Sequence, residues 1–246
     1  PTKPIRLRAE TPGGFVLTGK SQLVIEGEWL VVSGVAIKDG GPGGDGIVIK
    51  GHNNRLTLSA MDGGTYQHFV RLYGTKHRID HCFFARKTSE GALLQVEVDS
   101  REANHHRIER NHFGERAPLG HKGGEILRIG DSHQANFVSR AVVEQNLFER
   151  CAGGSEIISS QSGENTYRGN TFRHCDGMLT LRTGNRTVVD GNLFFGEGKP
   201  NSGGIRVSGE DHVVTNNYIE GVTSGGPGLQ RPLGAEDVGP AWLKQR

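Results

Sequence analysis

Two stretches of the sequence end in polar residues at matching places and could together form one chemical site. In "EIISSQS" an apolar pair runs into Gln161, and in "MLTLRTG" a similar apolar stretch ends on Arg182, 21 residues later. If these stretches lie on successive turns of a stacked structure, both side chains project from one face in neighbouring rows. Arg128 and Arg206 follow equivalent stretches on the turns to either side.

The predicted site is a polar and mainly cationic strip. His121, Lys122 and His133 flank the turn that carries Arg128. Guanidinium and ammonium groups in successive rows suit an extended polymer that carries a negative charge on each unit. We therefore expect an acidic polymer as the partner, with His121 and His133 as candidate proton carriers.

The elements that must position this strip come from an internal repeat. One phrase recurs as "HRIDHCFF", "HRIERNHF", "AVVEQNLF", "TYRGNTF", "TVVDGNLF" and "HVVTNNYI". Its last four asparagines, Asn146, Asn170, Asn192 and Asn217, are 24, 22 and 25 residues apart. Between the phrases lie further stretches with the period-two alternation of half-buried strands, such as "ALLQVEV" and "GIRVSG".

Repeats of roughly 20 to 30 residues made only of short strands predict a parallel β-helix. We expect one domain over residues 1–246, with the recurrent asparagines inside turns, where each amide bonds the backbone and the asparagine of the next coil. Residues 224–246 lack strand periodicity and are predicted to be an irregular tail packed on the solenoid. The chain opens in strand-like sequence, "PTKPIRLRAE", which is consistent with missing N-terminal coils.

Composition narrows the class of protein. Gly is frequent, at 38 of 246 residues, and hydrophobic content is 34%, which favours many short strands and turns over a helical bundle. The net charge of +2 gives no general attraction to nucleic acid. No apolar run is long enough to span a membrane. Three cysteines, none in metal-finger spacing, do not form a disulfide framework.

Several motifs resemble one known family. "KGGEILRIGDS", "EIISSQSGEN", "LRTGN" and "GGIRVSG" are similar to signatures of the alginate lyase and chondroitinase B family, polysaccharide lyase family six. "AETPGGFVLTGKSQLVIEGEWLVVSGV" resembles its first coils and "EDVGPAWL" its end, so the resemblance covers nearly the whole chain. It implies an all-β, single-stranded, right-handed parallel β-helix that cleaves uronate polymers, alginate first, by β-elimination.

The resemblance assigns catalytic roles to three positions of this sequence. The family's arginine, which acts as acid or stabiliser, falls on Arg182, and its lysine base falls on Gln161. Glutamine is not a general base at neutral pH. Three interpretations stay open: a catalytically silent relative, a substituted form of an active enzyme, or a lyase in which another group takes the proton.

The family's calcium site also differs here. Its asparagine position is Lys122, its first glutamate position is Gly154, and only Glu156 is kept. Calcium takes six to eight oxygen ligands, so we expect no metal and no other cofactor. Our hypothesis is that the ammonium of Lys122 takes the place of calcium, pairs with Glu156 and neutralises the uronate carboxylate, which makes Lys122 the third catalytic candidate.

The remaining candidates are substrate-binding residues. Arg128 and Arg206 could bind neighbouring sugar carboxylates or form structural ion pairs, and His121, Glu156 and His133 complete the predicted binding set. Two rival functions remain: a non-catalytic β-helix that binds acidic polysaccharide, and a β-helical hydrolase, which would need paired carboxylates. The family resemblance also implies a secreted or periplasmic protein.

Overall fold

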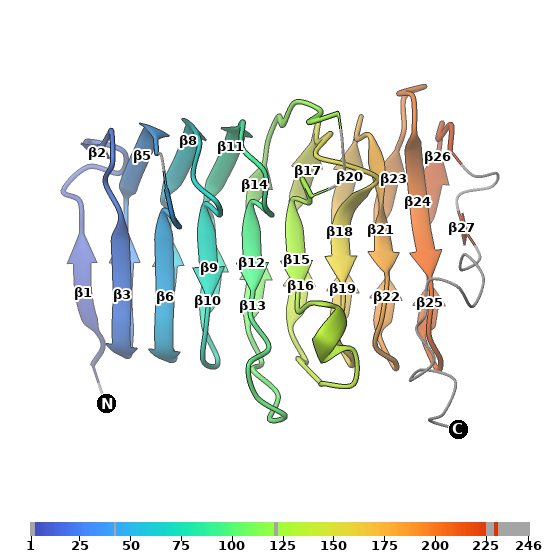
Figure 1. Cartoon of the computed structure of the whole chain (residues 1–246), viewed down its shortest axis with the longest axis horizontal. Helices are drawn as coiled ribbons and strands as arrows, with labels where there is room; N and C mark the ends of the chain where they lie inside the picture. Colours follow the sequence, from blue (N-terminus) through green and yellow to red (C-terminus); the bar gives the residue numbers. More distant parts are fainter. Residues whose placement is uncertain (1–2, 42, 121–122, 225–228, 231–246) are drawn as a thin grey trace.

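The chain winds into a solenoid of stacked coils, as a computed structural model shows (Figure 1). The structure describes residues 3–41, 43–120, 123–224 and 229–230. Within these residues the strands form three parallel sheets of nine strands each, here named sheets A, B and C. Each coil gives one strand to each sheet in turn, so every sheet runs along the solenoid.

The bounds of the strands follow the order of pairing in each sheet. Sheet A contains β1 (Ile5–Arg8), β4 (Leu30–Ser33), β7 (Arg55–Thr57), β10 (Arg78–Asp80), β13 (Arg107–Glu109), β16 (Val142–Glu144), β19 (Thr166–Arg168), β22 (Val188–Asp190) and β25 (Val213–Thr215). Sheet B contains β2 (Phe15–Leu17), β5 (Val35–Gly40), β8 (Ala60–Gly64), β11 (Phe83–Lys87), β14 (His112–Phe113), β17 (Leu147–Glu149), β20 (Thr171–Arg173), β23 (Leu193–Phe195) and β26 (Tyr218–Glu220). Sheet C contains β3 (Leu23–Glu28), β6 (Ile47–His52), β9 (Val70–Leu72), β12 (Leu94–Val96), β15 (Leu127–Ile129), β18 (Glu156–Ser160), β21 (Gly177–Leu181), β24 (Ser202–Val207) and β27 (Leu229–Gln230). A short 3-10 helix, η1 (Ser132–Gln134), follows β15.

The core is a set of columns in which like side chains stack from coil to coil. One column of sheet B consists of phenylalanines whose ring centroids are 5.5, 4.7, 4.7 and 4.6 Å apart: Phe84, Phe113, Phe148, Phe172 and Phe194. These distances match the spacing of about 4.8 Å between neighbouring strands. The apolar residues of the alternating sequence pattern therefore point inward and stack into one continuous core.

The recurrent asparagines form the predicted ladder inside the turn between sheets A and B. Asn170 is fully buried, and its Nδ2 donates to the Val143 carbonyl and to Oδ1 of Asn192, each over 2.9 Å. Asn146 makes the same pair of contacts one coil earlier, and Asn192 does so with Asn217 one coil later. The prediction that these amides bond the backbone and one another is confirmed.

The predicted all-β parallel β-helix is confirmed. Of the predicted C-terminal tail, residues 225–228 and 231–246 lie outside the described residues, and Leu229–Gln230 pair with β24 as β27. That residues 1–246 make a single domain stays a prediction. Among the residues that the structure describes, no helix has the length and apolar character that crossing a membrane requires.

Candidate functional site

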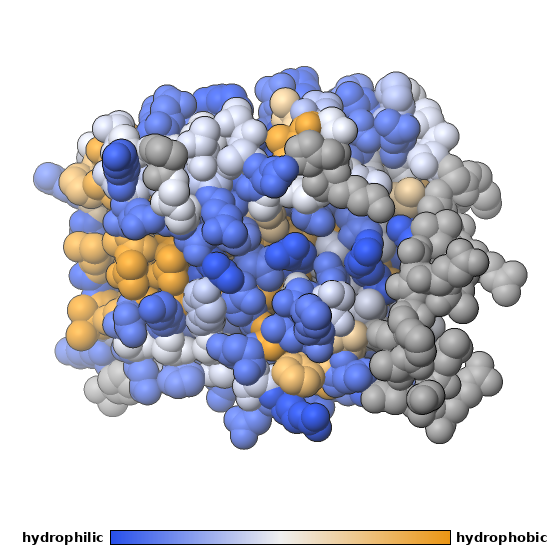
Figure 2. Space-filling model, viewed as in Figure 1, coloured by the Kyte–Doolittle hydropathy of each residue, from blue (hydrophilic) through white to orange (hydrophobic). Residues whose placement is uncertain are grey.

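Sheet C carries two neighbouring rows of outward-facing residues across its middle coils. Parallel pairing of β12, β15, β18, β21 and β24 puts these residues into the first row: Gln95, Arg128, Ser159, Thr180 and Arg206. The second row follows the ends of the strands and contains Gly130, Gln161, Arg182 and Ser208. In Figure 2, hydrophobic side chains gather over the first coils and hydrophilic ones over the middle coils of this face.

Gln161 and Arg182 lie beside each other on neighbouring coils, as their spacing predicted. The backbone N–H of Arg182 donates to the Ser160 carbonyl over 2.9 Å, which aligns the two residues across β18 and β21. Gln161 is 7% exposed, and its Nε2 donates to Oγ of Ser159 over 3.1 Å. The Arg182 side chain is 43% exposed, so it is the accessible member of the pair.

Glu156 connects two arginines of the strip, Arg182 and Arg206. Its Oε1 accepts a hydrogen bond from Nη1 of Arg182 over 2.9 Å and lies 3.8 Å from Nη1 of Arg206. The Glu156 carboxylate is almost fully buried, which strengthens both attractions by removing water from between the charges. Sequence reasoning expected Glu156 to pair with a lysine, and the described partners are two arginines.

A small pocket of about 50 Å³ opens between these charges. It is lined by the loop that leads into β15, by Gly154 and Ser155, and by the side chains of Glu156, Arg182 and Arg206. Glu125 also lines it, and its Oε2 is buried without a hydrogen-bond partner among the described residues. The pocket thus brings two carboxylates and two guanidinium groups together.

The other predicted strip residues differ in their surroundings. Nε of Arg128 donates to Oε1 of Gln95 over 2.6 Å, so a buried glutamine one coil earlier fixes this guanidinium. His133 lies in the exposed η1, where its backbone N–H donates to Oδ1 of Asp131 over 2.7 Å, and it does not line the pocket. His121 and Lys122 lie outside the described residues, so their predicted places stay predictions.

The donor atoms near Glu156 do not match the family's calcium ligands. Gly154 has no side-chain oxygen, and the single retained carboxylate, that of Glu156, is already shared by Arg182 and Arg206. In the part of the chain that the structure describes, no group of three or more His, Cys, Asp or Glu residues is arranged to hold a metal ion. Among the described residues, the positively charged side chains that line the pocket are those of Arg182 and Arg206.

A buried arginine behind the pocket was not predicted. Arg116 is fully buried, and its Nη1 donates to the Glu125 carbonyl over 2.9 Å. Its Nη2 donates to the carbonyls of Ser89 and Gly91 over 2.8 and 3.0 Å. Burial lowers the pKa of Arg116 to about 10, so the group is still charged at neutral pH. No sequence signal distinguishes this arginine from the many exposed ones.

The fold and the strip together define the class of protein, which is a parallel β-helix with fixed cationic side chains along one sheet. The family model described as chondroitinase B matches residues 1–226. The chain therefore belongs to the chondroitinase B family, polysaccharide lyase family six. A search of curated proteins finds no match.

Solved structures of the same family share the fold. The alginate lyase AlyGC is 41% identical with a TM-score of 0.90, over 95% of this chain and 34% of that one. A mannuronic acid specific family-six lyase from human gut microbiota is 38% identical with a TM-score of 0.89, over 94% of this chain and 56% of that one. An alginate lyase in complex with a trisaccharide is 28% identical with a TM-score of 0.82, over 90% and 50%. This chain spans between a third and somewhat over half of these proteins' lengths.

Proposed function

We propose that the strip on sheet C binds a uronate polymer, alginate first, and that the chain is a polysaccharide lyase acting by β-elimination. The observation that supports this most is the place of Arg182, an accessible arginine whose side chain is held by Glu156 and whose backbone lies beside position 161. Membership of a lyase family adds to it. The similarity to a mannuronic acid specific enzyme makes mannuronate-rich alginate the first substrate to test.

The reaction divides into three tasks for side chains. The C5–H bond breaks, a C4–C5 double bond forms, and the C4–O4 bond breaks with the departing oxygen taking a proton. A positive charge beside the uronate carboxylate makes the developing negative charge tolerable, and we assign this task to Arg206 and Lys122. Arg182 would donate a hydrogen bond to the departing O4.

The third task is removal of the C5 proton, and position 161 offers no general base for it. The amide of Gln161 can donate and accept hydrogen bonds but does not take a proton at neutral pH. We therefore expect slow elimination from this chain. The same observation favours a second candidate function, a non-catalytic protein that binds acidic polysaccharide through the strip.

The C4–C5 double bond absorbs ultraviolet light, which provides the test. The protein is mixed with mannuronate-rich alginate, guluronate-rich alginate and chondroitin sulfate, and absorbance and binding are followed together. A slow rise with one uronate supports the lyase. Binding without any rise supports the second candidate, and the absence of both contradicts the proposal.

We also propose that the protein acts outside the cytoplasm, secreted or periplasmic. The reason is the expected substrate, because a long acidic polymer does not cross a lipid bilayer unaided. Fractionation of the source cells with an antibody against the chain tests this, and a purely cytoplasmic signal would contradict it.

A further inference from the structure

A second groove crosses the outside of sheet A, on a different face from the strip. Its hollow of about 710 Å³ is lined by Trp29, Arg55, Arg78, Arg107 and Lys76, among others. A neighbouring hollow of about 510 Å³ shares Lys76 and His105 with it and extends to Arg140. The two hollows adjoin at these two shared residues and are together named the sheet A groove.

One edge of the groove is a column of residues with left-handed backbone. Trp29, Asn53, Lys76 and His105 have φ of 61°, 57°, 57° and 54°, one residue per coil at the turn into sheet A. This conformation is unfavourable, by roughly 1 kcal/mol or more each, for residues other than glycine and, to a lesser degree, asparagine. The stack holds it through hydrogen bonds between coils, such as Trp29 N–H to the His52 carbonyl over 3.2 Å. The groove edge is therefore rigid.

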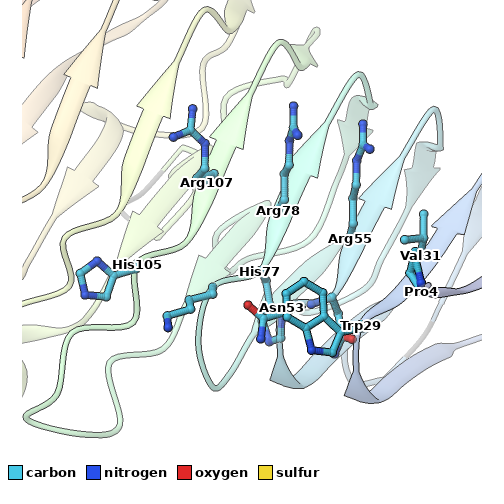
Figure 3. Close-up of a pocket in the computed structure, with 11 residues that line it drawn as sticks. Pro4, Trp29, Val31, Asn53, Arg55, His77, Arg78, His105 and Arg107 are labelled. Atoms are coloured by element: carbon cyan, nitrogen blue, oxygen red, sulfur yellow. Dashed lines mark hydrogen bonds between the residues drawn. The ribbon is translucent and has the colours of Figure 1, made fainter. Parts of the chain in front are cut away.

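The other side of the groove is a row of arginines in register. Arg55 pairs with Arg78 across β7 and β10, and Arg78 pairs with Arg107 across β10 and β13. Figure 3 shows their side chains extended in the same direction, with Trp29, Asn53 and His105 along the opposite side. The guanidinium groups are thus presented at the spacing of the coils, about 4.8 Å.

Acidic residues hold these arginines without covering them. Nη2 of Arg55 lies 2.6 Å from Asp80, Nη2 of Arg107 lies 2.8 Å from Glu109, and Arg78 also pairs with Glu109. The arginine side chains are nevertheless 37%, 39% and 49% exposed. Their guanidinium groups are pre-oriented, so little side-chain entropy is lost when an anion binds.

Lys76 adds a cation that is not committed to a protein carboxylate. No described acidic side chain forms an ion pair with Lys76, which lines both hollows. Trp29 supplies an exposed ring at the first coils, 39% accessible. An aromatic ring, arginine stems and cations in one rigid groove suit a ligand that has apolar ring faces and a repeated negative charge.

We propose that the sheet A groove is a second, non-catalytic binding site for an acidic polysaccharide chain. This inference rests on the proposed function for the kind of polymer involved. A 1,4-linked uronate chain advances by a distance similar to the coil spacing with each sugar, so successive carboxylates can meet successive coils. Trp29 stacks against the face of one sugar ring, and the arginine row and Lys76 bind the carboxylates. Nucleic acid fits less well, because bases need several stacking rings.

The test uses affinity electrophoresis through gels that contain mannuronate-rich alginate. The groove variant is Trp29→Asn with Lys76→Gln, where asparagine removes the ring and tolerates left-handed backbone, as Asn53 does in the same column. The control variant, Tyr218→Asn with Lys38→Gln, removes another exposed ring and another exposed lysine, both outside the groove. The strip variant is Arg182→Ala. Circular dichroism of every variant confirms that it is folded.

We expect the groove variant to bind alginate about tenfold more weakly than the wild type, with the control variant unchanged. The strip variant should also bind alginate more weakly than the wild type. A variant that combines the groove and strip substitutions should bind more weakly than either variant alone. If the groove variant binds alginate as tightly as the wild type and the strip variant does not, the proposed groove site is refuted and the strip remains the binding site. If only the groove variant loses affinity for alginate, the strip is refuted as a binding site and the groove site is supported. A wild type that alginate does not retard overturns both.

A single-stranded oligonucleotide in the gel distinguishes the class of polymer. We expect it to retard the wild type less than alginate does at equal ionic strength, and the groove variant to move like the wild type in it. Equal retardation that depends on Trp29 and Lys76 would show a general polyanion surface and would overturn the proposal.

Discussion

Arg182 donates a hydrogen bond from Nη1 to Oε1 of Glu156 over 2.9 Å, and this contact joins two neighbouring coils at the centre of the strip. Glu156 is buried at the base of β18, whereas Arg182 reaches solvent beyond the end of β21. The same carboxylate oxygen lies 3.8 Å from Nη1 of Arg206. One buried anion therefore orients two cations that a uronate carboxylate would meet.

Replacing Glu156 by glutamine tests this orienting role. The strip gains one positive charge, so we expect tighter alginate binding at low salt and a steeper loss of binding as salt rises. In a background that carries a lysine at position 161, turnover should fall about tenfold because Arg182 loses its charged partner. Glu197→Gln is the matched control, since Glu197 pairs with Arg173 on sheet B, away from both the strip and the sheet A groove. Identical salt profiles for the two variants would contradict the role.

The asparagine ladder should contribute strongly to stability at its buried rungs. Asn170→Ala removes an amide that donates twice and accepts from Asn146, leaving buried backbone groups unpaired. We expect the free energy of unfolding to fall by about 2 to 4 kcal/mol. Asn217→Ala, at the half-buried end of the ladder, should cost less. Urea denaturation measures both, and equal losses would contradict a cost set by burial.

The buried His77 predicts a loss of stability in acid. Its Nδ1 accepts from the backbone N–H of Asn54 over 3.1 Å, its Nε2 donates to the Tyr73 carbonyl over 2.7 Å, and burial lowers its pKa from 6.5 to about 4. The unfolded chain binds the proton first as pH falls, so stability is full above pH 6.5 and decreases by about 3 kcal/mol between pH 6.5 and pH 4.

His77→Asn should flatten part of this pH profile, because asparagine can accept the same backbone hydrogen bond without titrating, as Asn54 does from Leu30. The rest of the pH dependence of stability would persist, because buried His106, which stacks on His77, also has a lowered pKa. Thermal unfolding at several pH values gives the comparison, and an unaltered slope in His77→Asn would refute the assignment.

Arg116 should matter for both stability and the shape of the pocket. Arg116→Met keeps much of the volume but leaves the carbonyls of Ser89, Gly91 and Glu125 without their donor. We expect a loss of about 3 kcal/mol or more in the free energy of unfolding and weaker binding of alginate oligosaccharides. Arg116→Lys should recover part of the stability. Unchanged binding in a folded Arg116→Met protein would show that the loop does not depend on this contact.

The repeat was readable from sequence because its signal is local and recurs at the length of one coil. Each turn of chain places an asparagine and a phenylalanine at the same offsets, so the sequence alone predicts the ladder of Asn146, Asn170 and Asn192. The alignment of Gln161 with Arg182 followed from the same spacing. These features need only the rule that equivalent residues of successive coils stack.

The contacts of the site were not readable because they depend on irregularities between coils. A register shift between Glu156 and Ile158 brings the Glu156 carboxylate to Arg182, 26 residues later. Gln95 meets Arg128 across a spacing of 33 residues, because an inserted loop lengthens that coil. Arg116 is buried only because loop carbonyls from different coils converge on it. No pattern in the sequence predicts these three contacts.

The measurement that tests the central claim most directly is the rate of ultraviolet absorbance increase when Gln161→Lys is mixed with mannuronate-rich alginate. The account predicts a rate at least about a hundredfold above that of the wild type, because a base then stands beside Arg182. Gln161→Met should not show this gain, and adding Arg182→Ala to Gln161→Lys should abolish it. A folded Gln161→Lys protein that binds alginate yet produces no absorbance from alginate, chondroitin sulfate or related uronates would contradict the claim that this strip is an elimination site.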